Sequence, residues 1–153
     1  MILKIDIDEF TDPPSAEPFN KKIISKKELR LFLQSCAKNK RYSIVIFGAN
    51  WCPDARLLAG VLELPLVKKF LDSYAEILNI DIGDYDINMN LFSLFDSEIK
   101  DGVPRVFITD SSERVINLKS NDVMRKAREL SAQDIFNYFQ EIIINGPISN
   151  GNV

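Results

Sequence analysis

The apolar residues of this chain follow two spacings, which separate expected strands from expected helices. Continuous apolar runs rich in β-branched residues are typical of buried strands, and apolar residues three and four positions apart are typical of helices packed on a core. The first pattern predicts strands at 42–47, 75–82 and 103–109. The second predicts helices at 25–39, from Pro53 past Leu62, from Pro65 through Leu71, around 89–95, as a turn within 121–129, and from Ser131 through Ile143.

The order of these elements predicts a mixed sheet. A helix joins strand 42–47 to strand 75–82, and such a crossover makes the two strands parallel. The turn at 110–113 is expected to fold residues 114–118 back on strand 103–109 as an antiparallel hairpin. The sheet would then have a parallel half and an antiparallel half.

The length of the chain indicates a single domain. Its 153 residues are enough to bury a core without metal ions or disulfide bonds. We expect an N-terminal extension at 1–24 that includes a short edge strand at 2–7, and then the folded domain at 25–145. A flexible tail is expected at 146–153, where Gly146 and Pro147 end the last helix.

Cys52 lies where the strand at 42–47 gives way to a helix. Pro53 suits the first helical position, so Cys52 is expected at the N-cap. Unpaired backbone amides and the helix dipole favour an anion there, and a thiolate is an anion. A cysteine so placed can be reactive near neutral pH, although a small, inert, half-buried residue is the simpler interpretation.

The residues around Cys52 resemble the thioredoxin-like superfamily. The resemblance rests on Trp51-Cys52-Pro53-Asp54 after a strand and on Gly102-Val103-Pro104, which is similar to the loop that carries a cis-proline beside the cysteine in that fold. Within the superfamily the chain resembles a bacterial branch of thioredoxin family proteins over about residues 25–144. The further matches are Gly48 to Gly60, Asp81-Ile82-Gly83, Asn88-x-Asn90-Leu91 and Arg125 to Ser131.

The resemblance implies an α/β thioredoxin-like fold with a central mixed sheet and helices on both faces. It also implies that Cys52 is the nucleophile. The residues it places around the substrate are Trp51, Pro53, Asp54, Val103 and Pro104, with Trp51 walling the site and Val103 offering its backbone to an extended peptide. Asp54 has two opposed effects: the helix dipole favours it, but its charge opposes a second anion at Cys52, an effect that Arg56 could offset.

Two positions depart from ordinary thioredoxins. Ala55 replaces the second cysteine of Cys-x-x-Cys, and Ile46 stands where the family has a buried acid that assists that cysteine. Cys36 is not expected to replace it, because it lies near the start of the strand whose far end leads to Cys52, and a disulfide needs α-carbons within about 7 Å. We therefore interpret Cys36 as a core residue.

These departures predict a monothiol thiol-disulfide oxidoreductase or redox adaptor. Cys52 would form mixed disulfides with protein thiols or disulfides, and an external thiol, for which glutathione is a candidate, would resolve them. The alternative is a redox-inactive thioredoxin-fold module that binds a protein through the surface around Trp51 and Pro104. A peroxide-reducing enzyme is a weaker hypothesis, because Cys52 lacks the threonine and arginine context of such peroxidases.

The composition excludes several other functions. The chain has no histidine, which rules out imidazole catalysis, and its net charge of -3 gives no reason to expect nucleic acid as a partner. The Asp84-x-Asp86-x-Asn88 fragment lacks the glycine and closing glutamate of a calcium loop, so no metal and no resident cofactor are expected.

No stretch reaches the ~20 apolar residues of a membrane span, and the N-terminus does not resemble a signal peptide. We expect a cytoplasmic monomer that does not bind membranes, or a periplasmic protein if a leader has been removed.

Overall fold

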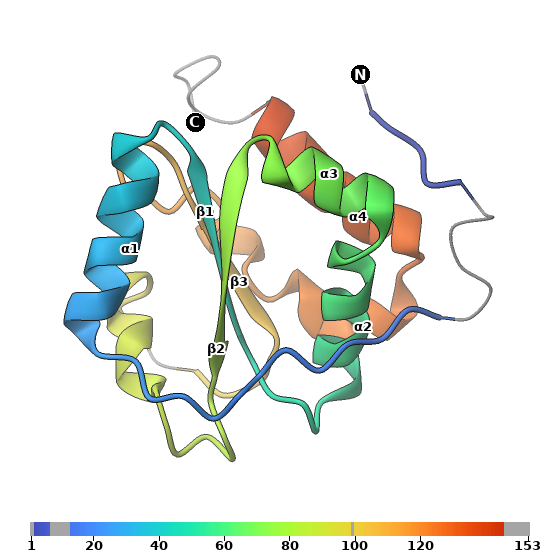
Figure 1. Ribbon diagram of the computed structural model, residues 1–153. Helices are drawn as coiled ribbons and strands as arrows, with labels where there is room; N and C mark the ends of the chain where they lie inside the picture. Colours follow the sequence, from blue (N-terminus) through green and yellow to red (C-terminus); the bar gives the residue numbers. More distant parts are fainter. Residues whose placement is uncertain (1, 7–12, 99, 146–153) are drawn as a thin grey trace.

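A computed structural model describes residues 2–6, 13–98 and 100–145 (Figure 1). The α-helices are α1 (Lys26–Lys38), α2 (Pro53–Leu62), α3 (Pro65–Asp72) and α4 (Ala132–Ile144). The strands are β1 (Tyr42–Gly48), β2 (Ala75–Asp81) and β3 (Arg105–Thr109). Short 3-10 helices are η2 (Met89–Leu94), η3 (Leu118–Ser120) and η4 (Val123–Glu129). The flexible tail expected at 146–153 lies outside the described residues.

The strands form a mixed sheet in the order β2-β1-β3. β1 and β2 are parallel, with Tyr42 opposite Ala75 and Gly48 opposite Asp81. β1 and β3 are antiparallel, with Phe47 opposite Arg105. The predicted mixed sheet is therefore confirmed, and the start of β3 lies beside the end of β1, next to the turn that leads to Cys52.

Helices cover both faces of the sheet, as predicted. Figure 1 shows α1 on one face and α2, α3 and α4 on the other. On the first face the rings of Phe47, Phe92, Phe95 and Phe107 form a cluster in which Phe47 and Phe92 have centroids 4.3 Å apart. On the second face Phe70 of α3 meets Phe136 of α4 edge to face at 5.6 Å. Burial of such rings is the main force that holds the layers together.

The capping signals that predicted two of the helices have the expected geometry. Ser25 and Glu28 form a capping box at the start of α1, and Ser131 and Asp134 form another at the start of α4. In each box a hydroxyl accepts a hydrogen bond from a backbone amide that the helix leaves unpaired. The proline at 65 begins α3 after a break at Leu64, as a proline in a long helical pattern should.

Residues 13–24 cross the ends of β1 and β2 before α1 begins (Figure 1). Phe19 is buried and packs on Gly48, where a Cβ would collide with its ring. The Lys21 amide donates a 2.7 Å hydrogen bond to Asp81 at the end of β2. This part of the extension therefore covers the end of the sheet from which the Cys52 turn leaves.

The prediction of a short edge strand at 2–7 is wrong for residues 2–6, the part of this segment that the structure describes. Residues 2–6 adopt no strand. Their backbone groups are instead bound by glutamine side chains of α4: the Leu3 amide donates to Gln140 and the Ile5 amide to Gln133, both at 2.7 Å. Side-chain amides thus provide the hydrogen bonds that a neighbouring strand would have provided.

The prediction that residues 114–118 form the second strand of a hairpin is also wrong, and the pairing there is limited. It is reduced to an isolated bridge between Thr109 and Val115. The Asn117 side chain accepts a hydrogen bond from the Ile108 amide at 2.9 Å and donates to the Val106 carbonyl at 2.8 Å. The Ile116 amide donates to the Ile108 carbonyl at 2.9 Å, and the Val106 amide donates to the Asn121 carbonyl at 3.0 Å. The buried Asn117 side chain and these two backbone bonds therefore pair the outer edge of β3 in place of the expected strand.

Candidate active site

Cys52 occupies the N-cap of α2, as the sequence predicts. β1 ends at Gly48, the chain turns, and Pro53 takes the first position of the helix. The Arg56 amide donates to the Cys52 carbonyl at 3.0 Å and closes the first helical turn. The Cys52 side chain makes no capping hydrogen bond and is only 6% exposed. Its sulfur therefore lies just beneath the surface, near helix amides that favour an anion.

A proline loop lies directly against this sulfur. The Val103-Pro104 peptide bond is cis, and both residues are buried. The Cys52 thiol donates a hydrogen bond to the Val103 carbonyl oxygen, with 3.6 Å between sulfur and oxygen. The two motifs that carried the resemblance thus meet in space, although they are far apart in the sequence.

Trp51 forms a wall beside Cys52 and is held by the loop after β2. Its indole Nε1 donates to the Gly83 carbonyl at 2.8 Å, and its ring meets Tyr85 edge to face at 5.8 Å. The side chain remains 49% exposed, which is unusual for tryptophan. A cavity of about 500 Å³ lies between Trp51 and the loop from Asp81 to Ile87. The lining of this cavity includes Trp51 but neither Cys52 nor Pro104.

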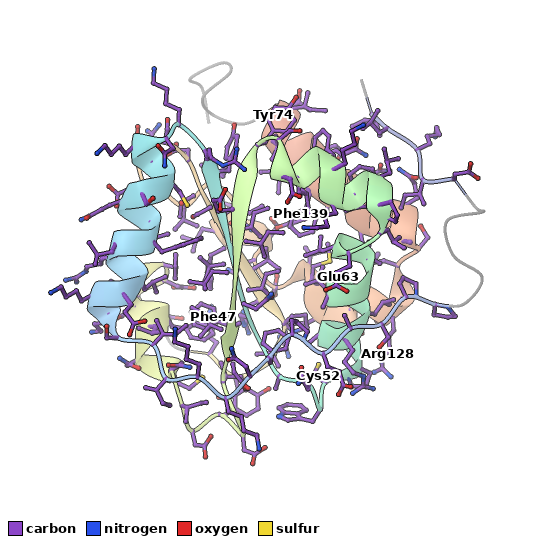
Figure 2. The ribbon with its side chains drawn as sticks, in the orientation of Figure 1. Phe47, Cys52, Glu63, Tyr74, Arg128 and Phe139 are labelled. Atoms are coloured by element: carbon purple, nitrogen blue, oxygen red, sulfur yellow. The ribbon has the colours of Figure 1, made fainter. Side chains whose placement is uncertain are left out.

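Asp54 lies in the first turn of α2 and binds Arg128 of η4. Its Oδ1 accepts hydrogen bonds from the Arg128 amide at 2.8 Å and from Arg128 Nε at 3.2 Å. Figure 2 shows Arg128 and Cys52 at the same end of the molecule. Arg56, considered above as the residue that offsets the charge of Asp54, donates instead to the Asn50 carbonyl at 2.7 Å.

Arg105 is a residue of the site region that the sequence analysis missed. It is 5% exposed and follows the cis-proline at the start of β3. Its guanidinium donates to the carbonyls of Gly102 and Asp101 at 2.9 and 2.8 Å and to Asn121 at 3.1 Å. Burial lowers its pKa. A charged residue within an otherwise apolar strand was the signal in the sequence, and here it fixes the loop that carries Val103 and Pro104.

The positions that depart from ordinary thioredoxins are buried. Ala55 is 1% exposed on α2, and Ile46 is 2% exposed in the centre of β1. Cys36 is buried in α1, on the opposite face of the sheet from α2, and both cysteines are free thiols (Figure 1). Burial and the nearby Glu76 carboxylate raise the pKa of Cys36 to about 11. The prediction that Cys36 is a core residue is confirmed.

In the Asp84-x-Asp86-x-Asn88 fragment after β2, the Asp86 and Asn88 side chains form hydrogen bonds with backbone groups of the protein. The Asp84 amide donates to Asp86, and the Asn88 side chain binds the Ile24 amide and the carbonyls of Lys22 and Asp81. Among the described residues, no group of three or more His, Cys, Asp or Glu side chains could hold a metal ion. No helix in the described part of the chain is both long and apolar enough to cross a bilayer.

One known structure has a similar overall fold. A disulphide isomerase from Xylella fastidiosa Temecula1 matches with a TM-score of 0.74 at 26% identity, covering 83% of this chain and 97% of that chain. A protein of unknown function from Pseudomonas aeruginosa matches with a TM-score of 0.44 at 15% identity, covering 78% of this chain and 80% of that chain. No protein-family model and no curated protein matches the chain.

The fold is therefore thioredoxin-like, of the kind that thiol-disulfide oxidoreductases use. Cys52 and the cis-proline lie together at the end of its sheet.

Proposed function

We propose that this protein is a monothiol thiol-disulfide oxidoreductase or redox adaptor that acts through Cys52. The observation that carries the proposal is the position of Cys52 at a helix N-cap, with its sulfur 3.6 Å from the carbonyl of Val103 in the cis-proline loop. Amides at a helix start stabilise a thiolate, and a thiolate is the form that attacks disulfides. The similarity to a disulphide isomerase supports the same class of reaction.

The reaction we propose has two balanced steps. In the first, the Cys52 thiolate attacks one sulfur of a disulfide, forms a mixed disulfide, and releases the other sulfur as a thiolate. In the second, the thiolate of an external thiol attacks the mixed disulfide on the partner's sulfur or on Sγ of Cys52. Attack on the partner's sulfur releases Cys52 as a thiolate and leaves the partner joined to the external thiol by a disulfide. Attack on Sγ releases the partner as a thiolate and leaves Cys52 in a mixed disulfide with the external thiol, which a second external thiol must then attack to release Cys52. Ala55 provides no second thiol, so the second step depends on that external thiol, for which glutathione is a candidate.

Intact-mass measurement after mixing with glutathione disulfide tests the proposal. In a Cys36→Ser variant we expect one glutathione adduct, which excess dithiothreitol removes. The matched control is the Cys52→Ser variant, which retains Cys36 and should gain no adduct. A Cys36→Ser protein that stays unmodified under conditions that modify an unfolded control would refute the oxidoreductase proposal.

The burial of Cys52 favours a second candidate function. Cys52 is 6% exposed and Trp51 beside it is 49% exposed. A partner that approaches the site would therefore contact the tryptophan ring more than the thiol. Such a surface suits a redox-inactive module that binds a protein partner. The two functions are separated by a capture experiment from the native cell extract. Capture that survives Cys52→Ser but is lost in Trp51→Ala favours the module, and capture that depends on Cys52 favours the oxidoreductase.

A further inference from the structure

The arginines around the site differ in what they bind. Arg56 donates to a backbone carbonyl, Arg128 binds Asp54, and Arg105 is held by two carbonyls and an asparagine. Arg125 of η4 differs, because no carboxylate among the described residues lies within 4.0 Å of it. Its side chain is exposed and has the capacity to bind an anion.

Arg125 nevertheless has a defined position against the cis-proline loop. Its guanidinium packs on Gly102, so closely that a Cβ at Gly102 would overlap it. Gly102 has a φ of +97°, which also favours glycine. The next residue is Val103, whose carbonyl accepts the hydrogen bond from the Cys52 thiol. The free cation is thus one residue from the group that contacts the reactive sulfur.

A second cation lies close to the same glycine. Nε of the buried Arg105 donates to the Gly102 carbonyl at 2.9 Å. Burial and the charge of Arg125 both lower the pKa of Arg105. Two guanidinium groups around one glycine repel each other, and an anion bound by the exposed one would reduce that repulsion.

Building on the proposed function, we infer that Arg125 determines substrate specificity by binding a carboxylate of the disulfide that Cys52 attacks. Arginine binds carboxylates through two parallel hydrogen bonds. The carboxylate comes either from glutathione or from an acidic residue beside the cysteine of a protein substrate. The net charge of -3 repels anions at long range, so a preference for anionic disulfides would arise locally.

Rates of mixed-disulfide formation with disulfides of different charge test this inference. The probes are glutathione disulfide, which is negative, bis(2-hydroxyethyl) disulfide, which is neutral, and cystamine, which is positive. In Arg125→Gln we expect the rate with glutathione disulfide, relative to the neutral probe, to fall about two- to five-fold, as for an exposed ion pair. In Arg125→Glu we expect a larger fall and a faster reaction with cystamine.

Arg30→Gln is the matched control. Arg30 is exposed on α1, and this substitution changes the net charge by the same amount as Arg125→Gln. The relative rates of Arg30→Gln should equal those of the parent protein. An unchanged ratio in Arg125→Gln, or an equal fall in Arg30→Gln, would overturn the inference.

A non-covalent measurement separates this inference from the proposed function. S-methylglutathione has the same carboxylates but cannot exchange disulfides. In nuclear magnetic resonance titrations it should shift the amide signals of Gly102 and Val103 in the parent protein and not in Arg125→Gln. If these shifts occur while the neutral disulfide fails to react with Cys52, the carboxylate site stands and the oxidoreductase proposal fails. Absence of the shifts overturns the carboxylate site even if Cys52 reacts.

Peptide disulfides identify the source of the carboxylate. Blocked peptides with Asp or Asn beside the half-cystine differ by one carboxylate. A faster reaction of the Asp peptide that depends on Arg125 indicates a protein substrate. If the reaction rate depends on Arg125 only with glutathione disulfide, the substrate is a small-molecule disulfide. If the rate depends on Arg125 with neither glutathione disulfide nor the Asp peptide, the inference is contradicted.

Discussion

The thiol of Cys52 donates a hydrogen bond to the carbonyl oxygen of Val103, with 3.6 Å between sulfur and oxygen. This contact joins the start of α2 to the loop before β3. It also occupies the backbone carbonyl that we expect an extended substrate to use. Loss of the thiol proton removes this hydrogen bond. The amides at the start of α2 are then the groups that favour the negative charge on sulfur. Because the protonated thiol and an extended substrate would compete for the same carbonyl, we expect deprotonation of Cys52 and substrate binding to favour each other.

Selective alkylation should identify Cys52 as the reactive cysteine. With iodoacetamide at about pH 7.5 we expect Cys52 to be modified first, because helix amides stabilise a thiolate there. Cys36 should remain unmodified in the folded protein, since burial and Glu76 raise its pKa to about 11. Peptide mapping by mass spectrometry distinguishes the two sites. Faster modification of Cys36 than of Cys52 would contradict the assignment of the nucleophile.

Restoring a cysteine at Ala55 should convert the monothiol site into a dithiol site. Residues 52 and 55 are three positions apart at a helix start, and side chains at this spacing are neighbours close enough for a disulfide. In a Cys36→Ser background, Ala55→Cys should therefore form an internal disulfide in place of a lasting glutathione adduct. Intact mass before and after reduction measures both products.

The control for this experiment is Ala55→Ser, which adds a side chain of similar size without a thiol. Ala55 is 1% exposed, so both variants must make room for one more atom in the core. Circular dichroism should show similar folding for the two. A glutathione adduct that persists in a folded Ala55→Cys protein would contradict the proposed role of the missing thiol.

The sequence predicted the parts of the site that depend on local signals. A β-branched run, a following Pro53 and helical spacing were enough to place Cys52 at a helix N-cap, because each signal acts over a few residues. The capping boxes of α1 and α4 were predicted for the same reason. The positions of these elements in a mixed sheet followed from the helix that connects two parallel strands.

Contacts between distant side chains were not predictable in the same way. The Asn117 side chain provides two of the hydrogen bonds expected from a strand at 114–118, and the glutamines of α4 provide those expected from a neighbour of the strand at 2–7. Arg105 binds the carbonyls of the cis-proline loop, a role that needs the fold of that loop to be known. In each case a polar side chain satisfies the backbone, and apolar periodicity contains no information about it.

Stability should fall more steeply at high pH in the parent protein than in a Cys36→Ala variant. The pKa of Cys36 is raised from 9.0 to about 11 in the folded state, mainly by burial. Between these values the unfolded chain has lost the thiol proton that the folded chain retains, so the free energy of unfolding decreases as pH rises. Below about pH 9 both states are protonated and the effect is absent.

Urea unfolding across this pH range measures the effect. The raised pKa values of Tyr42 and Tyr138 add a similar decrease to both proteins. Only the difference between parent and Cys36→Ala therefore reports on the cysteine. A difference in stability that stays constant from about pH 8 to pH 11 would show that Cys36 is not desolvated.

Asp54 should stabilise the start of α2 mainly through its bond to the backbone of η4. Its Oδ1 accepts from both the amide and the side chain of Arg128. Asp54→Ala removes both bonds and a carboxylate at a helix start, and we expect it to lower the free energy of unfolding by about 1 to 2 kcal/mol. Arg128→Ala keeps the backbone bond, and the Arg128 side chain is 63% exposed, so we expect a cost below about 1 kcal/mol. Urea unfolding of both variants and of Asp54→Asn, which retains an acceptor oxygen, ranks the three effects. If Arg128→Ala costs as much as Asp54→Ala, the ion pair and not the backbone hydrogen bond joins α2 to η4.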